Sequence, residues 1–307
     1  FVASTFTKPL LRISVDRGVL AERSQDKPAS ETGAERSNLT QRVLSAIVFV
    51  PGVLALAVGG RWTLFALVLC VSVRSAWEWC YLSAQASYRP SVWLALSLTA
   101  GAVGMSVVAS GSGLIVYLSF AATVFFAEAL RRGTERYAAN ALLGLGAVVY
   151  AGLLGSAPLA LVRVLGGQSE AYALVGVLFV SIWLTDALAY FSGRQWGRKK
   201  LAPTISPKKT VVGFFGGLIG ALLPLLLSPW IEVLRPAELA GLLVLVGLGG
   251  QVGDLVESAI KRDMGNAKDA PALIPGHGGM LDCFDSYFFA FPLAYVYAVL
   301  LTVFRSL

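Results

Sequence analysis

The pattern of apolar and polar positions predicts a helical membrane protein. Nine apolar stretches are long enough to cross a hydrocarbon core of about 30 Å as helices. Glycines and a proline, among them Gly249, Gly250 and Pro224, predict broken or kinked helices in the seventh and eighth stretches. We therefore expect an all-α polytopic fold with nine transmembrane helices, at 43–60, 62–82, 91–110, 112–130, 139–162, 172–192, 211–229, 237–259 and 286–304.

Polar residues divide this chain into three parts. Residues 1–40 are rich in Ser, Thr, Arg and Glu and have the composition of a disordered tail. Residues 41–170 hold the first five apolar stretches, which carry few polar side chains. Polar residues within or beside membrane helices are costly and indicate function, and they gather in residues 171–307. We expect this C-terminal membrane region to be the catalytic one.

Composition and charge support the membrane assignment and orient the chain. Hydrophobic residues make up 56% of the sequence, charged residues 14%, and the mean hydropathy is +0.70, which excludes an ordinary soluble domain. With the N-terminus inside, 20 of the 25 lysines and arginines fall on the cytoplasmic side, as the positive-inside rule requires. The net charge of +7 is then a one-sided basic face. Anionic lipid headgroups or a phosphorylated substrate suit it, whereas nucleic acid does not, because no soluble basic domain is present.

The three cysteines add no site of their own. Cys70, Cys80 and Cys283 show no CxxC spacing, and two of them lie within an apolar stretch. This pattern argues against disulfides and against a zinc site.

The first polar cluster lies in the segment DALAYFSGR. Asp186 interrupts an apolar helix, and Tyr190 follows one turn later on the same face. The functional interpretation is a substrate-binding carboxylate and phenol with Arg194 beside them. The alternative is a carboxylate that merely pairs with a helix-end arginine such as Arg194.

The second cluster is the segment SPKKT, which carries Ser206, Lys208, Lys209 and Thr210 and opens into a helix. Basic side chains and free backbone N–H groups at a helix start bind phosphate oxygens well. The alternative is ordinary positive-inside charge, which would explain the lysines but not the flanking Ser-Pro and Thr. We interpret the segment as a phosphate-binding loop.

The third cluster closes the eighth apolar stretch. Asp254, Glu257 and Ser258 lie on neighbouring turns, and Lys261 and Arg262 follow them. A single acid here could be only a helix-end residue. An Asp and a Glu together indicate a cation between them.

The fourth cluster, LIPGHGGMLDCFDS at 273–286, contains the only histidine of the chain. Asp282 and Asp285 follow His277 at the start of the last apolar stretch. Carboxylate oxygens bind hard cations such as Mg²⁺ together with nucleotide phosphates. A lone histidine is more often structural, but the glycines around His277 would allow close approach of a substrate.

These segments together resemble the signature of the phosphatidate cytidylyltransferase (CDP-diacylglycerol synthase) family. GDLVES and SAIKRDMGNAKDAPALIPGHGGMLDCFDS carry most of the resemblance, and SPKKT and DALAYFSGR match other family segments in the same order. The resemblance is specific over 186–290 and looser before it, at Arg42 and Glu78. It implies a polytopic membrane enzyme, usually a homodimer, in a bacterial inner membrane or in a chloroplast or mitochondrial membrane.

The family's reaction joins CTP to phosphatidic acid in phospholipid biosynthesis and gives CDP-diacylglycerol and pyrophosphate, with Mg²⁺ and often a monovalent cation such as K⁺. Phosphoryl-group transfer depends mainly on positioning and on neutralising developing charge. We expect Asp254, Asp282 and Asp285 to hold the metal, and Lys261, Arg262 and His277 to be catalytic. Substrate binding is expected from Asp186, Tyr190, Arg194, Ser206, Lys208, Lys209, Thr210, Lys268, Asp269, Gly276, Gly278 and Gly279.

The signature departs from the family pattern at four places, which keeps other functions open. Five residues rather than four separate Arg262 from Lys268, and Pro271 replaces a small residue. Val212 replaces a Glu, and Cys283 replaces an Arg. One alternative is a non-catalytic or weakly active relative that serves as a subunit of a membrane complex. A transporter is a weaker alternative, because it would not need this many cations around a Gly-His-Gly-Gly turn.

Overall fold

The computed structural model describes residues 45, 47–108, 111–265, 267, 270–271 and 278–307. Within them the chain is almost entirely helical. The N-terminal half contains a short helix at Ile47–Val58, α2 (Arg61–Gln85), α3 (Val92–Val108), α4 (Gly111–Arg131), α5 (Tyr137–Ala147), the π-helix η1 (Val148–Leu154) and α6 (Ala157–Val164). The C-terminal half contains α7 (Ser169–Trp196), β1 (Lys200–Ala202), β2 (Ser206–Thr210), α8 (Val211–Leu222), the 3-10 helix η2 (Leu223–Trp230), α9 (Pro236–Asp263), α10 (Met280–Cys283) and α11 (Tyr287–Ser306).

The helices confirm an all-α polytopic membrane fold, although the number of spans differs from the prediction. Within the described residues, seven helical segments are long and apolar enough to cross a membrane. The first and third predicted spans correspond to shorter apolar helices, Ile47–Val58 and Val92–Val108. The second of these has 17 residues, which at about 1.5 Å per residue is a little short of the hydrocarbon thickness.

The predicted break in the seventh span is confirmed, and the one in the eighth is wrong. The helix that starts at Val211 changes from α to 3-10 geometry at Leu223, next to Pro224, which cannot donate a backbone hydrogen bond. In contrast, α9 is one continuous helix of 28 residues that includes Gly249 and Gly250. A β-carbon placed on Gly249 would lie 3.0 Å from the Cα atom of Ala290 in α11. The glycine therefore serves close helix packing and does not break the helix.

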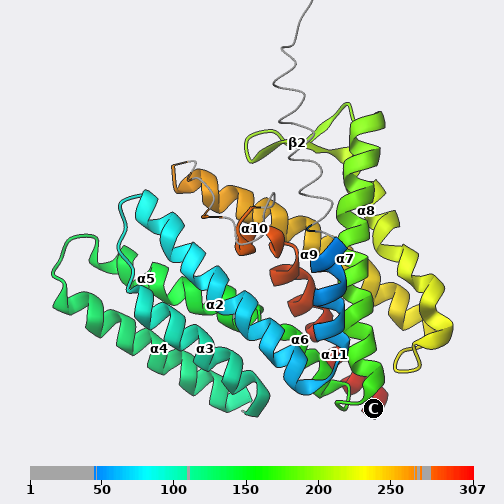
Figure 1. The fold of residues 1–307 in the computed structure, drawn as a ribbon, viewed down its shortest axis with the longest axis horizontal. Helices are drawn as coiled ribbons and strands as arrows, with labels where there is room; N and C mark the ends of the chain where they lie inside the picture. Colours follow the sequence, from blue (N-terminus) through cyan, green and yellow to red (C-terminus); the bar gives the residue numbers. More distant parts are fainter. Residues whose placement is uncertain (1–44, 46, 109–110, 266, 268–269, 272–277) are drawn as a thin grey trace, which may run out of the picture.

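The helices form two groups that α11 joins. One group contains α7, α8 and α9, and the other contains α2 to α5, with α11 contacting α9 on one side and α6 and η1 on the other (Figure 1). The two strands form an antiparallel hairpin that extends from the end of α7, opposite the C-terminus of the chain (Figure 1). The hairpin end therefore gathers the chain segments in which the polar clusters lie.

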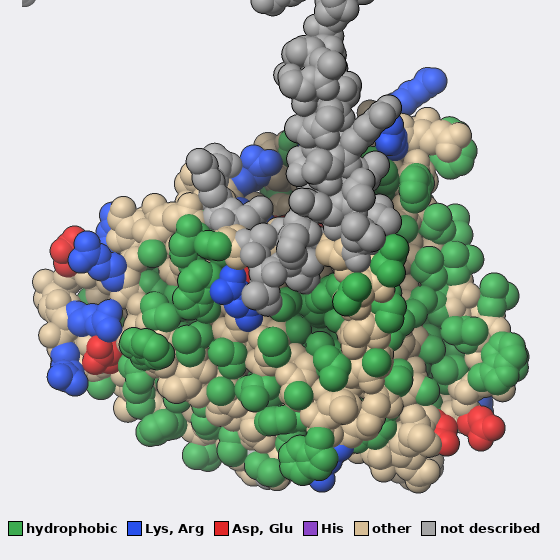
Figure 2. Space-filling model, viewed as in Figure 1, with side chains coloured by type: hydrophobic (Ala, Val, Ile, Leu, Met, Phe, Trp, Pro, Cys, Tyr) green, Lys and Arg blue, Asp and Glu red, His purple; other side chains and the backbone are tan. Residues whose placement is uncertain are grey.

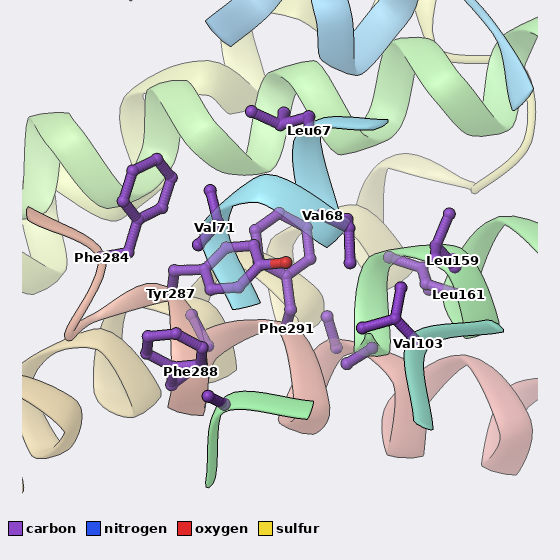
Figure 3. Close-up of a cluster of buried hydrophobic side chains, with 14 of the residues drawn as sticks. Leu67, Val68, Val71, Val103, Leu159, Leu161, Phe284, Tyr287, Phe288 and Phe291 are labelled. Carbon is purple, nitrogen blue, oxygen red and sulfur yellow. The ribbon is translucent and has the colours of Figure 1, made fainter. Parts of the chain in front are cut away.

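Aromatic side chains of α11 fill the centre of the molecule. Tyr287 and Phe291 are buried and face Val68 and Val71 of α2 (Figure 3). The ring of Phe179 from α7 stacks on Tyr287 with centroids 5.7 Å apart. The Tyr287 hydroxyl donates a hydrogen bond to the Gly155 carbonyl, so the buried polar group is satisfied. This core fixes the start of α11 and with it the turn that precedes Tyr287.

The outer surface has the character of a membrane protein. Apolar side chains cover most of the helical body on the face that Figure 2 shows. Large apolar residues such as Trp62, Trp93, Phe215 and Trp230 are more than half exposed. Because exposed apolar area on this scale is not tolerated in water, the protein is an integral membrane protein.

Candidate functional site

A cavity of about 570 Å³ lies at the hairpin end between α7, the hairpin, α8 and α9. Its wall contains eight of the residues that the sequence analysis assigns to substrate or metal: Asp186, Tyr190, Arg194, Ser206, Lys208, Lys209, Thr210 and Asp254. These residues come from three segments of the chain. The cavity is large enough for a small-molecule ligand and carries charges of both signs.

The α7 side of the cavity presents a carboxylate, a phenol and a guanidinium. Asp186 and Tyr190 both reach the cavity, as their spacing of one helical turn predicts. Arg194 donates a hydrogen bond of 3.1 Å to the Tyr190 hydroxyl. This contact leaves the acidic side chain of Asp186 facing the cavity, so the simple Asp186–Arg194 pair is not the arrangement found.

The lysine-bearing segment is a strand and not a loop. Ser206–Thr210 forms β2, and Thr210 then caps the start of α8 by accepting a hydrogen bond of 3.1 Å from the Gly213 N–H. A β-carbon placed on Gly193 of α7 would lie 2.8 Å from the Thr210 hydroxyl oxygen and 3.4 Å from Cα of Gly213. The two glycines therefore let α7 and α8 pack closely next to β2, whose Lys208 and Lys209 line the cavity.

Lys209 and Asp254 join the hairpin to α9 across the cavity. The ammonium of Lys209 lies 2.6 Å from the Asp254 carboxylate and 3.4 Å from the Gln251 carbonyl. The Gln251 side-chain amide donates a hydrogen bond of 3.2 Å to the Phe214 carbonyl in α8. Because Gln251 is buried and Lys209 and Asp254 are only partly exposed, the three residues form the inner wall of the site.

A second group of charges surrounds Lys261 at the end of α9. Its ammonium pairs with Glu257 one turn earlier and lies 3.0 Å from the Asp282 carboxylate in α10. Lys261 is thus a cation beside Glu257 in the structure, and a cation bound between Asp254 and Glu257 stays a prediction. Arg262 donates a hydrogen bond to the Ile205 carbonyl at the turn of the hairpin. That bond ties the hairpin to α9 and gives Arg262 an anchoring contact.

Asp285 lies between the two charge groups. A β-carbon placed on Gly253 would collide with the Asp285 carbonyl, so the turn before α11 rests directly on α9. Burial raises the pKa of the Asp285 carboxyl well above its usual value, and the nearby carboxylates of Asp254 and Asp186 raise it further. The acids of the two groups are therefore close enough to influence one another.

The carboxylates suit a divalent cation bound together with phosphates. Within the described parts of the chain, no three acidic, His or Cys side chains are close enough to form a metal site alone. Mg²⁺, however, is usually held by one or two carboxylates and completed by substrate phosphates and water. The carboxylates of Asp254 and Asp282 are of the type that such a cation uses.

The remaining predicted residues belong to the sequence segment 268–279. Lys268, Asp269, Gly276 and His277 lie outside the described residues. Gly278 packs against the Asp282 carboxylate, and Gly279 is the residue before the first turn of α10. A β-carbon placed on Gly278 would collide with the Asp282 carboxylate, and one placed on Gly279 would collide with the Glu78 carboxylate.

Cys283 occupies a half-buried position among these acids. Burial raises the pKa of its thiol to about 12, and the carboxylates of Asp282, Glu78 and Asp285 add to the effect. The thiol is therefore neutral at physiological pH. An arginine at this position would have three carboxylates nearby.

Arg74 is a residue near the site that the sequence analysis did not assign, and Glu78 makes more contacts there than a loose family position suggests. Both lie in α2, yet the Glu78 carboxylate accepts hydrogen bonds from the backbone N–H groups of Met280 and Leu281 in α10. The available signal was a charged pair four residues apart inside an apolar helix.

Comparisons with known proteins place the chain in a family. The sequence model of a family described as the cytidylyltransferase family matches residues 40–301. Proteins named phosphatidate cytidylyltransferase from Staphylococcus epidermidis and Staphylococcus aureus are 44% identical to this chain over 128 residues. The match covers 41% of this chain and 49% of each relative. The chain therefore spans about half the length of the curated relatives it matches.

Proposed function

The chain belongs to the cytidylyltransferase family, and from this premise we propose that it is a phosphatidate cytidylyltransferase. It transfers the cytidylyl group of CTP to phosphatidic acid and forms CDP-diacylglycerol and pyrophosphate. The observation that carries the proposal is the cavity at the hairpin end, where eight residues from three signature segments meet. The staphylococcal relatives favour a bacterial membrane over an organelle membrane as its location.

In this reaction a phosphate oxygen of phosphatidic acid attacks the α-phosphorus of CTP. The bond from that phosphorus to the bridging oxygen breaks, and pyrophosphate leaves. Lys208 and Lys209 bind phosphate oxygens at the cavity, and Lys261 neutralises charge at the α10 side. Such transfer needs aligned and charge-compensated groups rather than a covalent intermediate.

Asp254, Asp282 and Asp285 would hold Mg²⁺, which supplies neutralisation of the phosphate charge when bound. These acids would do so from the last third of α9, from α10 and from the turn before α11. K⁺ is a further expected ion from the family resemblance. His277 and its neighbouring glycines are assigned to the nucleotide pocket.

The position of the cavity suits a lipid substrate. It lies at helix ends, and Tyr190 and Phe191 beside it are more than half exposed. The acyl chains of phosphatidic acid can therefore stay in the bilayer while its phosphate enters among the lysines. A homodimer is the expected assembly, again from the family resemblance.

The departure at Pro271 is compatible with this function. Its carbonyl accepts a hydrogen bond of 2.8 Å from Arg74, and proline keeps its carbonyl although it lacks an N–H. Cys283 is the departure behind the alternative of a weakly active or non-catalytic subunit, because a thiol cannot replace the donors of an arginine. The family match and the relatives' names do not favour that alternative.

The deciding experiment measures pyrophosphate release by purified protein given CTP, Mg²⁺ and phosphatidic acid. CDP-diacylglycerol should appear in equal amount by mass spectrometry. Phosphatidylcholine in place of phosphatidic acid is the matched control, because its phosphate is already a diester. Absence of both products, with copurification in a fixed-stoichiometry assembly, would instead support the subunit alternative.

A further inference from the structure

Arg74 and Glu78 form an ion pair within the apolar helix α2, in which the glutamate is buried and the arginine is partly exposed. The Arg74 Nε atom lies 2.9 Å from the Glu78 carboxylate, and Glu78 is 1% exposed. The Arg74 guanidinium also lies over the Trp77 ring at 4.2 Å. Removing the Glu78 charge from water costs more than a single contact returns, so the buried carboxylate requires further partners.

Glu78 finds those partners in α10. Its carboxylate accepts hydrogen bonds of 2.9 Å from the Met280 N–H and 2.7 Å from the Leu281 N–H. These are the first two N–H groups of α10, which lack partners inside the helix. The residue before them is Gly279, which has no side chain to cap the helix. Glu78 therefore provides the cap from a position about 200 residues earlier in the chain.

Arg74 makes the second connection. Its Nη2 atom donates a hydrogen bond of 2.8 Å to the Pro271 carbonyl. The pair thus bonds the signature segment at two places, Pro271 and the start of α10. A β-carbon on Gly279 would collide with the Glu78 carboxylate, so this glycine is the residue that allows the approach.

We infer that Arg74 and Glu78 are positioning residues for the reaction, which together hold α10 so that Asp282 faces Lys261. Asp282 directly follows the two residues that Glu78 binds, and its carboxylate lies 3.0 Å from the Lys261 ammonium. The inference rests on the proposed function. Stability alone does not account for the pair, because apolar residues of similar volume would usually serve a helix interior as well or better.

The test compares Glu78→Gln and Arg74→Lys with wild type in two assays. Glutamine keeps the shape of Glu78, but its amide offers one acceptor oxygen and directs an N–H₂ group at the second backbone donor. Lysine keeps the charge of Arg74 but cannot bridge Glu78 and Pro271 with a planar fork. Glu128→Gln is the matched control, since it breaks another i,i+4 arginine pair at 2.9 Å that lies in α4.

The first assay separates kcat from KM. A displacement of about 1 Å in a catalytic group costs about 100-fold in rate, so we expect a loss of that order for Glu78→Gln and about tenfold for Arg74→Lys. The KM for CTP should change less than about threefold, because the cavity lysines are untouched. Glu128→Gln should behave as wild type.

The second assay measures alkylation of each cysteine by peptide mapping. Cys283 is in α10 and half-buried, whereas Cys80 lies two residues after Glu78 and is buried in α2. Loss of the cap should speed Cys283 alkylation by about tenfold or more, the equivalent of one hydrogen bond to a charged group. Cys80 should stay unreactive, which reports that the bundle is folded.

The inference requires both changes in the same folded variant. Slower turnover without faster Cys283 alkylation would overturn it, and so would the reverse. If Cys80 becomes reactive in Glu78→Gln, that variant is not properly folded. The turnover and the Cys283 alkylation rate of Arg74→Lys then test the inference in its place. A wild-type protein without turnover would reject the proposed function, whereas fast Cys283 alkylation in Glu78→Gln would still show that Glu78 holds α10.

Discussion

Substitution of Asp254 by asparagine separates the chemical role of this residue from its structural one. Asparagine has nearly the same shape but no charge, so it cannot pair with Lys209 or hold a divalent ion. In the structure the Asp254 carboxylate contacts the Lys209 ammonium at 2.6 Å and lines the cavity. The substitution therefore tests both contacts without opening a void.

The expected cost in stability is small. The side chains of Lys209 and Asp254 are 23% and 33% exposed, so water screens their attraction. A pair of this kind contributes about 0–1 kcal/mol, which corresponds to a fall in melting temperature of about 2–4 °C at most. Asp254→Asn should thus be recovered as a folded protein.

The expected cost in rate is large. A bound divalent ion contributes several kcal/mol of charge stabilisation in the transition state. Loss of about 3 kcal/mol lowers the rate about 100-fold. We expect at least this decrease in Mg²⁺-dependent pyrophosphate release, and the same for Asp282→Asn.

The assay is initial-rate pyrophosphate release at saturating CTP over a range of Mg²⁺ concentrations, with thermal unfolding measured in parallel. Glu128→Gln is again the control, because it breaks an exposed arginine pair in α4. It should lose as little stability as Asp254→Asn and retain its rate. Turnover of Asp254→Asn within threefold of wild type would refute the metal assignment.

Three further predictions address topology, the cysteine and helix packing. Cysteine labelling should place 194–209 and 261–285 on the same membrane face as the N-terminal tail, and opposite faces would contradict the charge distribution. Cys283→Arg should raise turnover by about tenfold to 100-fold, because arginine restores hydrogen-bond donors to phosphate. If the wild type turns over at about 10 per second and the substitution lowers this rate, the cysteine suits the active enzyme and is not a loss of function. Gly253→Ala should lower stability by about 1–3 kcal/mol in thermal unfolding, because its β-carbon meets the Asp285 carbonyl, whereas Gly104→Ala, where nothing lies within 4 Å, should not.

The location of the cavity could be predicted because its residues are costly in a membrane. Asp186 and Asp254 interrupt apolar helices, and such residues are retained mainly for function. The order of the motifs along the chain also predicted the family, and the family match over residues 40–301 confirms it. The sequence could not show that Lys209 would bond to Asp254, because that contact depends on how closely α7 and α8 pack at Gly193 and Gly213.

The hairpin strands and the π-helix η1 could not be predicted from the pattern of apolar and polar residues. The strands have three and five residues, and β2 contains Pro207, so no alternation of apolar and polar positions marks them. The π-helix at Val148–Leu154 lies within a uniformly apolar stretch. Helix type there depends on packing against α2, α3 and α11, which hydropathy does not record.

Glu78 shows what kind of signal such a sequence does contain. An arginine and a glutamate four residues apart look like an ordinary helix pair, which in water is worth about 0.2–0.5 kcal/mol. Inside an apolar helix the same pair is not self-sufficient, because a buried carboxylate requires more hydrogen bonds than one partly exposed arginine gives it. Arg74 and Glu78 meet this requirement with three backbone groups of the signature segment. A charged pair at this spacing in an apolar span therefore predicts a third segment bonded to it, although it does not identify which one.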